Sequence, residues 1–316
     1  MRQYLDTVGW FLRLYAGCFF SSSTVVGAMV FCATALEPHA GILAALAVGT
    51  AVLTASALGL ISEQSPPSVY AYSALFIGMG AMHTFANPVL ALALATLGAA
   101  AAALLTAAVR GVLSRVGLPA LTLPFTLVYM CAISAGSALG AEWSIPTHVD
   151  PSPYLDVLPP LVRLFFESLA AILFSPRAEV GFAVFIALCA SGVHAPLLAV
   201  LAFSINLLLA RLLVLPTPVA FAALINSTFT AIGLGIAWYS PNWLGYVRAM
   251  VGACLCVLLT VALSAPLARL ELMPMSLPFN LSIYAVLLIA NQRASQQTIG
   301  KGPAYEHSGN ASASYG

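Results

Sequence analysis

A short proline-containing segment that carries a hydroxyl residue occurs twice in this chain. It reads Leu-Pro-Ala-Leu-Thr-Leu-Pro-Phe at Leu118–Phe125 and Leu-Met-Pro-Met-Ser-Leu-Pro-Phe at Leu272–Phe279, 154 residues later. Each proline removes a backbone donor and frees a carbonyl of the preceding turn, which then needs a polar partner or water. The repeat therefore predicts two interrupted membrane helices that face a polar path, an arrangement typical of transport sites.

Thr122 and Ser276 are the hydroxyl residues of the two segments. They could edge a solute path as hydrogen-bond acceptors, or they could only satisfy the carbonyls that the prolines free. For a single threonine in a membrane, the second explanation is the commoner one. Because the hydroxyl occurs at equivalent positions of both segments, the sequence favours the first.

The composition places both segments in a membrane. Of the 316 residues, 61% are hydrophobic and only 7% are charged, against about 25% charged in a typical soluble protein. A hydrocarbon core near 30 Å needs about 20 apolar residues per helix, so the chain can hold roughly ten spans. We expect an all-α integral membrane protein, multi-pass in the cell membrane (the inner membrane if the chain is bacterial) and surrounded by lipid.

Charge and cysteine content argue against several other classes of protein. The 11 basic and 10 acidic residues give no basic face for nucleic acid. The six cysteines lie in apolar segments without the spacing of metal ligands, which favours buried free thiols. The sequence has no nucleotide-binding loop and no nucleophile with a matching base. We therefore expect no enzyme activity, no cofactor, no metal site and no coupling to ATP.

The apolar stretches divide the chain into two halves. We expect a first repeat at 1–140, an acidic extracytoplasmic linker at 141–160, a second repeat at 161–290 and a flexible polar tail at 291–316. A polar run at 21–24 divides the first apolar stretch into a short helix and a full span that begins near its end. The helices of the two repeats must position the two proline-containing segments.

The distribution of basic residues predicts how the two halves are oriented. Basic residues favour the cytoplasm, so we expect Arg2, Arg110, Arg115 and the tail inside and the acidic linker outside. Corresponding loops of the two halves then lie on opposite faces, which requires an odd number of spans in each half. We therefore predict two inverted repeats, each with about five transmembrane helices plus one half-spanning tilted helix.

Isolated polar residues within or beside the apolar stretches have competing explanations. Arg13 and Glu167 occupy equivalent positions of the two halves and could mark pore vestibules, although snorkelling from helix ends is commoner. Arg211, near the end of a span, is expected to snorkel or to bond to a carbonyl. His83 and His194 lie at segment ends, where a proton relay is the less favoured hypothesis.

With these segments, the chain resembles the urea transporter family, of the bacterial urea-channel type, over roughly residues 10–290. The family hallmark, Leu-Pro-x-x-Thr-x-Pro-Phe, is matched in full by Leu118–Phe125 and in part by Leu272–Phe279. A second family segment, Tyr-Asn-Gly followed by small and aliphatic residues, is similar to Tyr72–Gly78 and Ile225–Ser227. The resemblance implies a passive channel with about ten spans and two half-helices, assembled as a homotrimer with one pore in each protomer.

The resemblance also implies a narrow slot for urea, walled by aromatic and aliphatic side chains and edged by oxygen atoms. The central hydroxyls, the half-helix aromatics and the slot walls carry over to Thr122, Ser276, Phe20, Phe174, Tyr72, Phe76, Ile225 and Phe229.

The chain departs from the family pattern at the pore entrances. The family places Gln or Glu on each half-helix, three residues before the aromatic, where it binds the amide groups of urea. Here these positions hold Gly17 and Ala171, and Tyr72-Ser73 lacks the family's Asn. Three hypotheses therefore remain open: a urea channel, a channel for a short amide, ammonia or another small neutral solute, and a non-conducting membrane scaffold.

Overall fold

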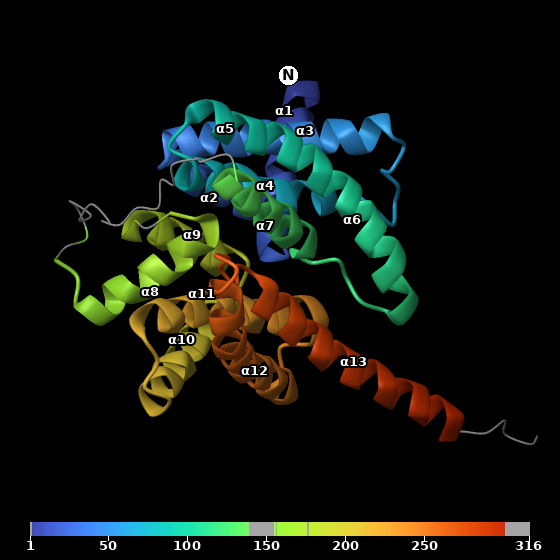
Figure 1. Cartoon of the computed structure of the whole chain (residues 1–316). Helices are drawn as coiled ribbons and strands as arrows, with labels where there is room; N and C mark the ends of the chain where they lie inside the picture. The colour runs from blue at the N-terminus through green and yellow to red at the C-terminus, as the bar shows by residue number, and fades with distance from the viewer. Residues whose placement is uncertain (1, 139–154, 156, 176, 301–316) are drawn as a thin grey trace, which may run out of the picture.

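The computed structural model of the chain describes residues 2–138, 155, 157–175 and 177–300. Every regular element in this part of the chain is a helix, as the sequence predicted. Figure 1 shows the first half of the chain above the second. The predicted linker and the predicted tail fall partly on residues 139–154 and 301–316, outside the described residues.

The helices of the first half are α1 (Arg2–Ala16), η1 (Gly17–Phe19), α2 (Thr24–Ala35), α3 (Pro38–Ala57), α4 (Pro67–Thr84), α5 (Pro88–Ala93), η2 (Leu94–Gly98), α6 (Ala99–Leu113), η3 (Ser114–Val116) and α7 (Leu123–Ala138). Those of the second half are α8 (Pro160–Ala170), η4 (Ala171–Leu173), α9 (Ala178–Ala190), α10 (His194–Leu212), α11 (Thr217–Gly233), η5 (Leu234–Trp238), α12 (Trp243–Ala268) and α13 (Leu277–Gly300). Because α13 continues to Gly300, the first part of the predicted tail is helical.

Several of these helices are suited to a membrane. Five helical segments of the described residues are long and apolar enough to cross one: Pro38–Ala57, Pro88–Val116, His194–Leu212, Thr217–Trp238 and Trp243–Ala268. The pairs α1/α2 and α8/α9 pass the same test if each bent pair is taken as one span, which gives up to 7. Two shorter apolar helices begin within the repeated proline segments, α7 and the part of α13 up to Asn291.

The first apolar stretch bends at the polar run that was predicted to divide it. The 3-10 turn η1 is followed by Phe20, whose φ of 58° lies in the left-handed region, and the chain then turns by 80° into α2. The same bend recurs after η4, where φ is 60° at Phe174 and the helices meet at 82°. The predicted full span from Thr24 was wrong, because α2 has only 12 residues, about 18 Å of helix.

The two halves share further backbone irregularities at positions 154 residues apart. Just before the two hydroxyl residues, φ is 49° at Leu121 and 46° at Met275. For a residue with a Cβ, the left-handed conformation costs roughly 1–2 kcal/mol, so it persists only where the surrounding structure holds it. The halves are therefore related in local conformation as well as in sequence.

One glycine in each half allows the bent pair of helices to pack closely. A Cβ at Gly27 of α2 would collide with the carbonyl oxygen of Leu12 in α1. A Cβ at Gly181 of α9 would collide in the same way with the carbonyl oxygen of Phe166 in α8. These helices therefore touch through their backbones on both sides of each bend, next to Phe20 in the first half and Phe174 in the second.

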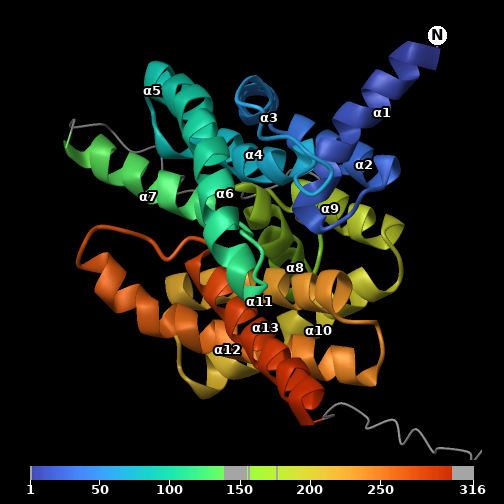
Figure 2. The same ribbon diagram turned by 90° about the vertical axis from the view of Figure 1, so that its right-hand side faces the viewer.

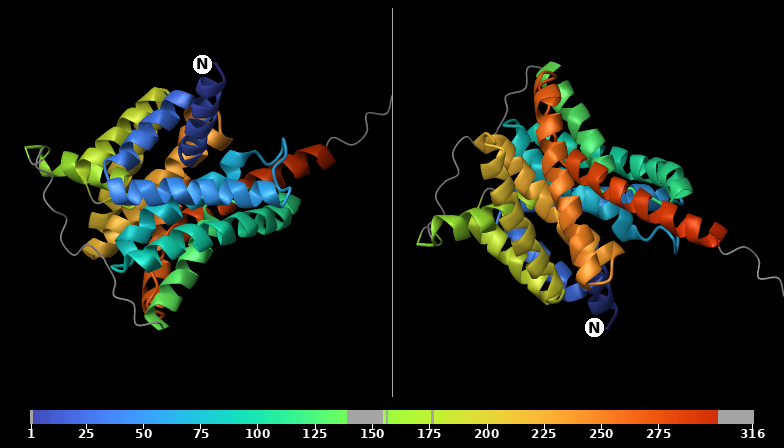
Figure 3. Two further views of the ribbon diagram at one scale, coloured as in Figure 1. Left: turned by 90° about the horizontal axis from the view of Figure 1, so that it is seen from above. Right: turned by 90° about the horizontal axis from the view of Figure 1, so that it is seen from below.

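The elements from the two halves meet at the centre of the molecule. Helices α2 and α9, far apart in the sequence, pack against each other and lie side by side in Figure 3. Helices α4 and α11 are the most enclosed, with buried side chains along most of their length. The start of α1 and the end of α13 lie at opposite sides of the molecule in Figures 1 and 2. The central helices are thus the ones that can surround a site.

The cysteines are free, but not all of them are buried as predicted. Cys18 and Cys256 are buried, whereas Cys32, Cys131 and Cys189 are exposed. All three exposed thiols lie on apolar helices. Because the surroundings of such helices in a membrane are apolar, an exposed position there does not require a polar side chain.

Candidate functional site

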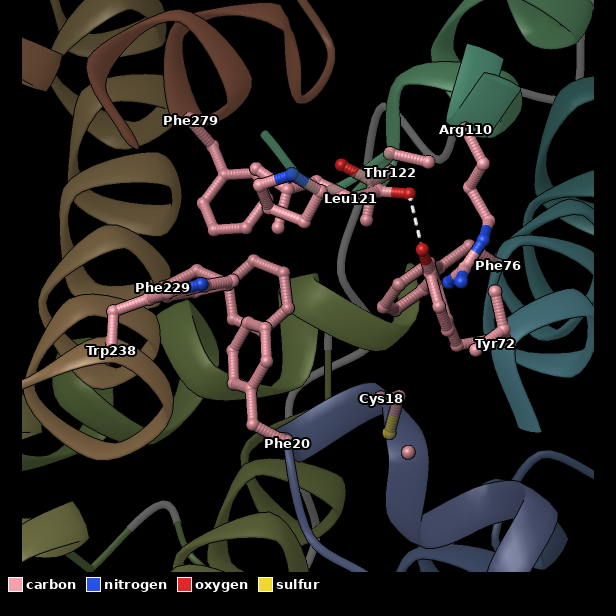
Figure 4. Close-up of a pocket in the computed structure, with 14 residues that line it drawn as sticks. Cys18, Phe20, Tyr72, Phe76, Arg110, Leu121, Thr122, Phe229, Trp238 and Phe279 are labelled. Carbon is pink, nitrogen blue, oxygen red and sulfur yellow. Dashed lines mark hydrogen bonds between the residues drawn. The ribbon is translucent and has the colours of Figure 1, made fainter. Parts of the chain in front are cut away.

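A cavity of about 190 Å³ lies between elements of the two halves (Figure 4). The first half contributes η1, α4, α6 and the first proline-containing segment, and the second half contributes aromatic side chains of α11, η5 and α13. The residues that line it are Gly17, Cys18, Phe20, Val69, Tyr72, Phe76, Arg110, Pro119, Ala120, Leu121, Thr122, Phe229, Trp238 and Phe279.

One side of the cavity is aromatic. The rings of Phe229 and Phe279 stack with centroids 4.5 Å apart and planes 23° apart. Phe20 lies 5.5 Å from Phe229 and, edge-on, 5.5 Å from Trp238. Figure 4 shows these four side chains together on one side of the cavity. They form an apolar wall of ring faces and edges, against which a flat molecule can lie.

The opposite side carries polar groups, among them two backbone carbonyls. The Tyr72 hydroxyl donates to the carbonyl of Leu121 at 2.6 Å, drawn as the dashed line in Figure 4. The Tyr284 hydroxyl donates to the carbonyl of Ala120 at 2.9 Å. Both carbonyls precede the start of α7, where the proline segment interrupts the helix. A carbonyl oxygen has two lone pairs, so each can accept a further hydrogen bond.

The two repeated hydroxyls meet at the end of this polar side. Thr122 Oγ1 and Ser276 Oγ lie 2.8 Å apart and share a hydrogen bond. Thr126 bonds to Ser276 at 2.6 Å, and Asn280 Nδ2 donates to Thr122 at 3.1 Å. Thr126 and Asn280 are themselves 154 positions apart, so the contacts of the two halves match. Thr122 also lines the cavity, whereas Ser276 lies directly behind it.

Aromatic contacts continue from the cavity to Phe174, after η4. Phe76 touches Phe229 at 6.2 Å and Phe125 at 5.7 Å between ring centroids. Phe125 in turn touches Phe174 at 5.7 Å. A continuous series of ring contacts therefore connects Phe20, at the end of η1, with Phe174, at the end of η4.

The structure brings most of the predicted pore residues together, at different distances from the cavity. Five of them line it: Phe20, Tyr72, Phe76, Thr122 and Phe229.

The other three predicted residues lie outside the cavity lining. Ser276 bonds to Thr122, and Phe174 is linked through Phe125. Ile225 is partly buried and packs against the hydrophobic core.

The residue after Ile225 makes a contact that matches one in the first half. Asn226 Nδ2 donates to the carbonyl of Met275 at 2.9 Å. This contact corresponds to the one from Tyr72 to Leu121, because both residues of each pair are separated by 154 positions. Applying that separation to Tyr72 would have selected Asn226 from the sequence.

Sequence reasoning also missed several residues of the site. Arg110 was assigned only to a cytoplasmic loop, and Trp238 and Tyr284 were not considered. Phe125 and Phe279 belong to the repeated segments, but only the hydroxyls of those segments were proposed as pore residues. For these two phenylalanines the repeat itself was the available signal.

Three of the isolated polar residues of the sequence have local partners, whereas Nε2 of His83 is buried without a hydrogen-bond partner. Arg13 donates to a carbonyl of its own helix at 3.2 Å, and Glu167 pairs with Arg163 at 3.5 Å. Both contacts fit positions on helix surfaces. His194 Nδ1 shares a hydrogen bond of 2.7 Å with the Tyr246 hydroxyl. Among the described residues, no group of His, Cys, Asp and Glu could hold a metal ion.

A comparison with protein families identifies the chain. The sequence model of the urea transporter family matches residues 8–291, a range that includes both bends, both proline segments and the whole cavity. A search of curated proteins found no match to this chain. Members of the matched family are channels for passive urea transport and are not enzymes. The chain therefore belongs to the urea transporter family.

Proposed function

We propose that urea crosses this protein through a slot that runs from Phe20 to Phe174, with the hydroxyls of Thr122 and Ser276 near its middle. The observation that carries the proposal is the cavity with an aromatic wall on one side and carbonyl acceptors on the other. The continuous ring contacts between the two half-helix ends support the same path.

This lining fits a small, flat, neutral molecule. A polar group that enters an apolar pore without a hydrogen-bond partner loses about 1–3 kcal/mol. Carbonyl oxygens along one side offset that loss for the N–H groups of urea, while its flat faces lie against the rings. An ion would lose far more hydration than these groups can replace.

The two halves act, in this proposal, as inverted repeats that each supply one end of the slot. The left-handed residues at Phe20 and Phe174, and at Leu121 and Met275, support the relation, since they recur at the same separation. Equivalent contacts of Tyr72 and Asn226 support it as well.

A second candidate is a channel for another small neutral solute, such as a short amide or ammonia. It is favoured by Gly17, which lines the cavity and has no side chain to bind an amide group. Ala171, at the same position of the second half-helix, has no polar side chain either.

We further propose that the channel works as a homotrimer in the cell membrane. Small residues such as Gly78 and those of Ala99–Ala103 allow close contacts between helices. Gly78 lies against the backbone of Ala44 in α3, within the same protomer. Ala99, Ala102 and Ala103 are also buried within the protomer. The proposed trimer thus rests on the family resemblance. Native mass spectrometry in lipid nanodiscs tests it, and detection of the monomer alone would contradict the trimer.

Stopped-flow light scattering on proteoliposomes tests the proposed function. Urea, methylurea, acetamide and glycerol are compared at equal osmolarity, with and without protein. We expect urea to equilibrate fastest and its rate to be unchanged when proton and sodium gradients are removed. Fastest passage of acetamide would favour the second candidate. Equal rates with and without protein for every solute would show that the protein does not conduct.

A further inference from the structure

We infer that Arg110 selects the solute at the cavity, donating a hydrogen bond to the carbonyl oxygen of a neutral amide and repelling cations of the same shape. The inference rests on the proposed function, since it names how one end of the proposed slot distinguishes solutes. Arg110 lies in the last turn of α6 and is one of the residues that line the cavity.

The Arg110 side chain is held in place by one contact that leaves donors free. In Figure 4 it extends from α6 toward Tyr72. Its Nη2 donates to the backbone carbonyl of Gln64 at 2.6 Å, across the loop before α4. A guanidinium has five N–H donors in a planar fork. This contact therefore fixes the group and leaves other N–H donors available for a solute.

The charge of Arg110 is not neutralised by a carboxylate nearby. Its hydrogen-bond partner, the Gln64 carbonyl, is neutral, and no ion pair among the described residues includes Arg110. None of the residues that line the cavity is acidic. A positive charge beside a small, largely apolar cavity repels a cationic solute more strongly than it would in bulk water.

Arg110 also supplies a hydrogen-bond donor, which the rest of the polar side of the cavity lacks. The carbonyls of Ala120 and Leu121 are acceptors, and the Tyr72 hydroxyl already donates to Leu121. The Thr122 hydroxyl is engaged with Ser276 and Asn280. An amide brings N–H donors and one carbonyl acceptor, so its carbonyl needs a donor on this side of the cavity. On the aromatic side Trp238 has an N–H, but it carries no charge and cannot exclude cations.

The inference predicts discrimination between urea and guanidinium. Both are planar and nearly equal in size, but guanidinium carries a positive charge and has an N–H group in place of the carbonyl. The wild-type protein should pass urea and exclude guanidinium. Thiourea, whose sulfur is a poor acceptor, should pass more slowly than urea.

The test replaces Arg110 and compares these three solutes in proteoliposomes at neutral pH. For Arg110→Met we expect urea flux per folded protein to fall by about tenfold or more, the loss of one hydrogen bond to a charged group. Guanidinium flux should become measurable, and the preference for urea over thiourea should shrink. Arg110→Lys keeps the charge, so it should still exclude guanidinium, with urea flux between those of wild type and Arg110→Met.

Arg115→Met is the matched control. It removes the same charge five residues further along, from a residue of η3 that does not line the cavity. Wild-type selectivity in Arg110→Met would overturn the inference. An equal change of selectivity in Arg115→Met would also overturn it, because it would indicate a general effect of surface charge. If Arg110→Met does not fold, passage of guanidinium through Arg110→Lys would contradict the inference. Failure of the wild-type protein to pass urea would instead contradict the proposed function.

Discussion

Thr122 and Ser276 share a hydrogen bond of 2.8 Å, although they are 154 positions apart in the sequence. Each hydroxyl also bonds to a residue of the opposite half, Ser276 to Thr126 and Thr122 to Asn280. The two proline-containing segments therefore meet directly at the centre of the molecule. The contact also means that neither hydroxyl serves only the carbonyl of its own interrupted helix.

Replacing Thr122 with Val tests whether its hydroxyl serves the path. The change keeps the approximate shape but removes an oxygen from the cavity lining. We expect urea flux per folded protein to fall roughly 5- to 150-fold, the equivalent of about 1–3 kcal/mol for one unmatched polar group. Ser276→Ala should also reduce the flux, since it removes the partner that holds the Thr122 hydroxyl.

Thr50→Val is the control for this change, because the Thr50 hydroxyl bonds only to a carbonyl of its own helix α3. Flux is measured by stopped flow, and melting temperature by intrinsic fluorescence in detergent. Normal flux together with a lowered melting temperature in Thr122→Val would mean that the hydroxyl is only structural.

Gly27→Ala should destabilise the bend after η1. The added Cβ would collide with the carbonyl oxygen of Leu12, a backbone atom that cannot move without shifting α1. Overpacking of this kind costs about 1–3 kcal/mol or more, so we expect a clearly lower melting temperature and less folded protein. Gly49→Ala in α3 is the control, since a Cβ there meets nothing within 4 Å. Equal stability of both variants would contradict the proposed packing of α1 against α2.

Phe229→Ala should widen the cavity and relax its selectivity. Phe229 contacts Phe20 and Phe279 of the aromatic wall and Phe76 across from it, so its removal opens the wall. We expect glycerol, which the wild-type protein should exclude, to pass at a measurable rate. The control is Phe182→Ala, because the Phe182 side chain is 46% exposed on α9 and does not line the cavity. Continued exclusion of glycerol by folded Phe229→Ala would argue against this wall as the size filter.

Gly17→Gln should restore an amide-binding side chain at the cavity. A Cβ at this position has room, with its nearest neighbours, both in Ser68, at 3.5 Å and 3.6 Å. One added hydrogen bond contributes about 0.5–1.5 kcal/mol, so half-saturation should occur at a urea concentration lower by roughly 2- to 12-fold. The measurement is the concentration dependence of labelled urea uptake. Gly49→Gln, away from the cavity, should leave the half-saturating urea concentration unchanged.

The sequence by itself determined the class of protein and the places where its helices break. A high apolar fraction fixes a membrane environment whatever the arrangement of the helices. The bends after Phe20 and after Phe174 lie at polar residues that interrupt apolar stretches, and a helix begins within each proline segment. Such features depend on neighbouring residues along the chain, so they can be predicted locally.

The tertiary structure alone decided which side chains face the cavity. Successive residues on a helix point about 100° apart, so a shift of one position turned the predicted Ile225 toward the core and left Asn226 to bind Met275. Arg110 and Trp238 reach the cavity from helices whose crossing cannot be deduced from their own sequences. Which side chains meet depends on how distant helices pack, and that packing is a property of the whole chain.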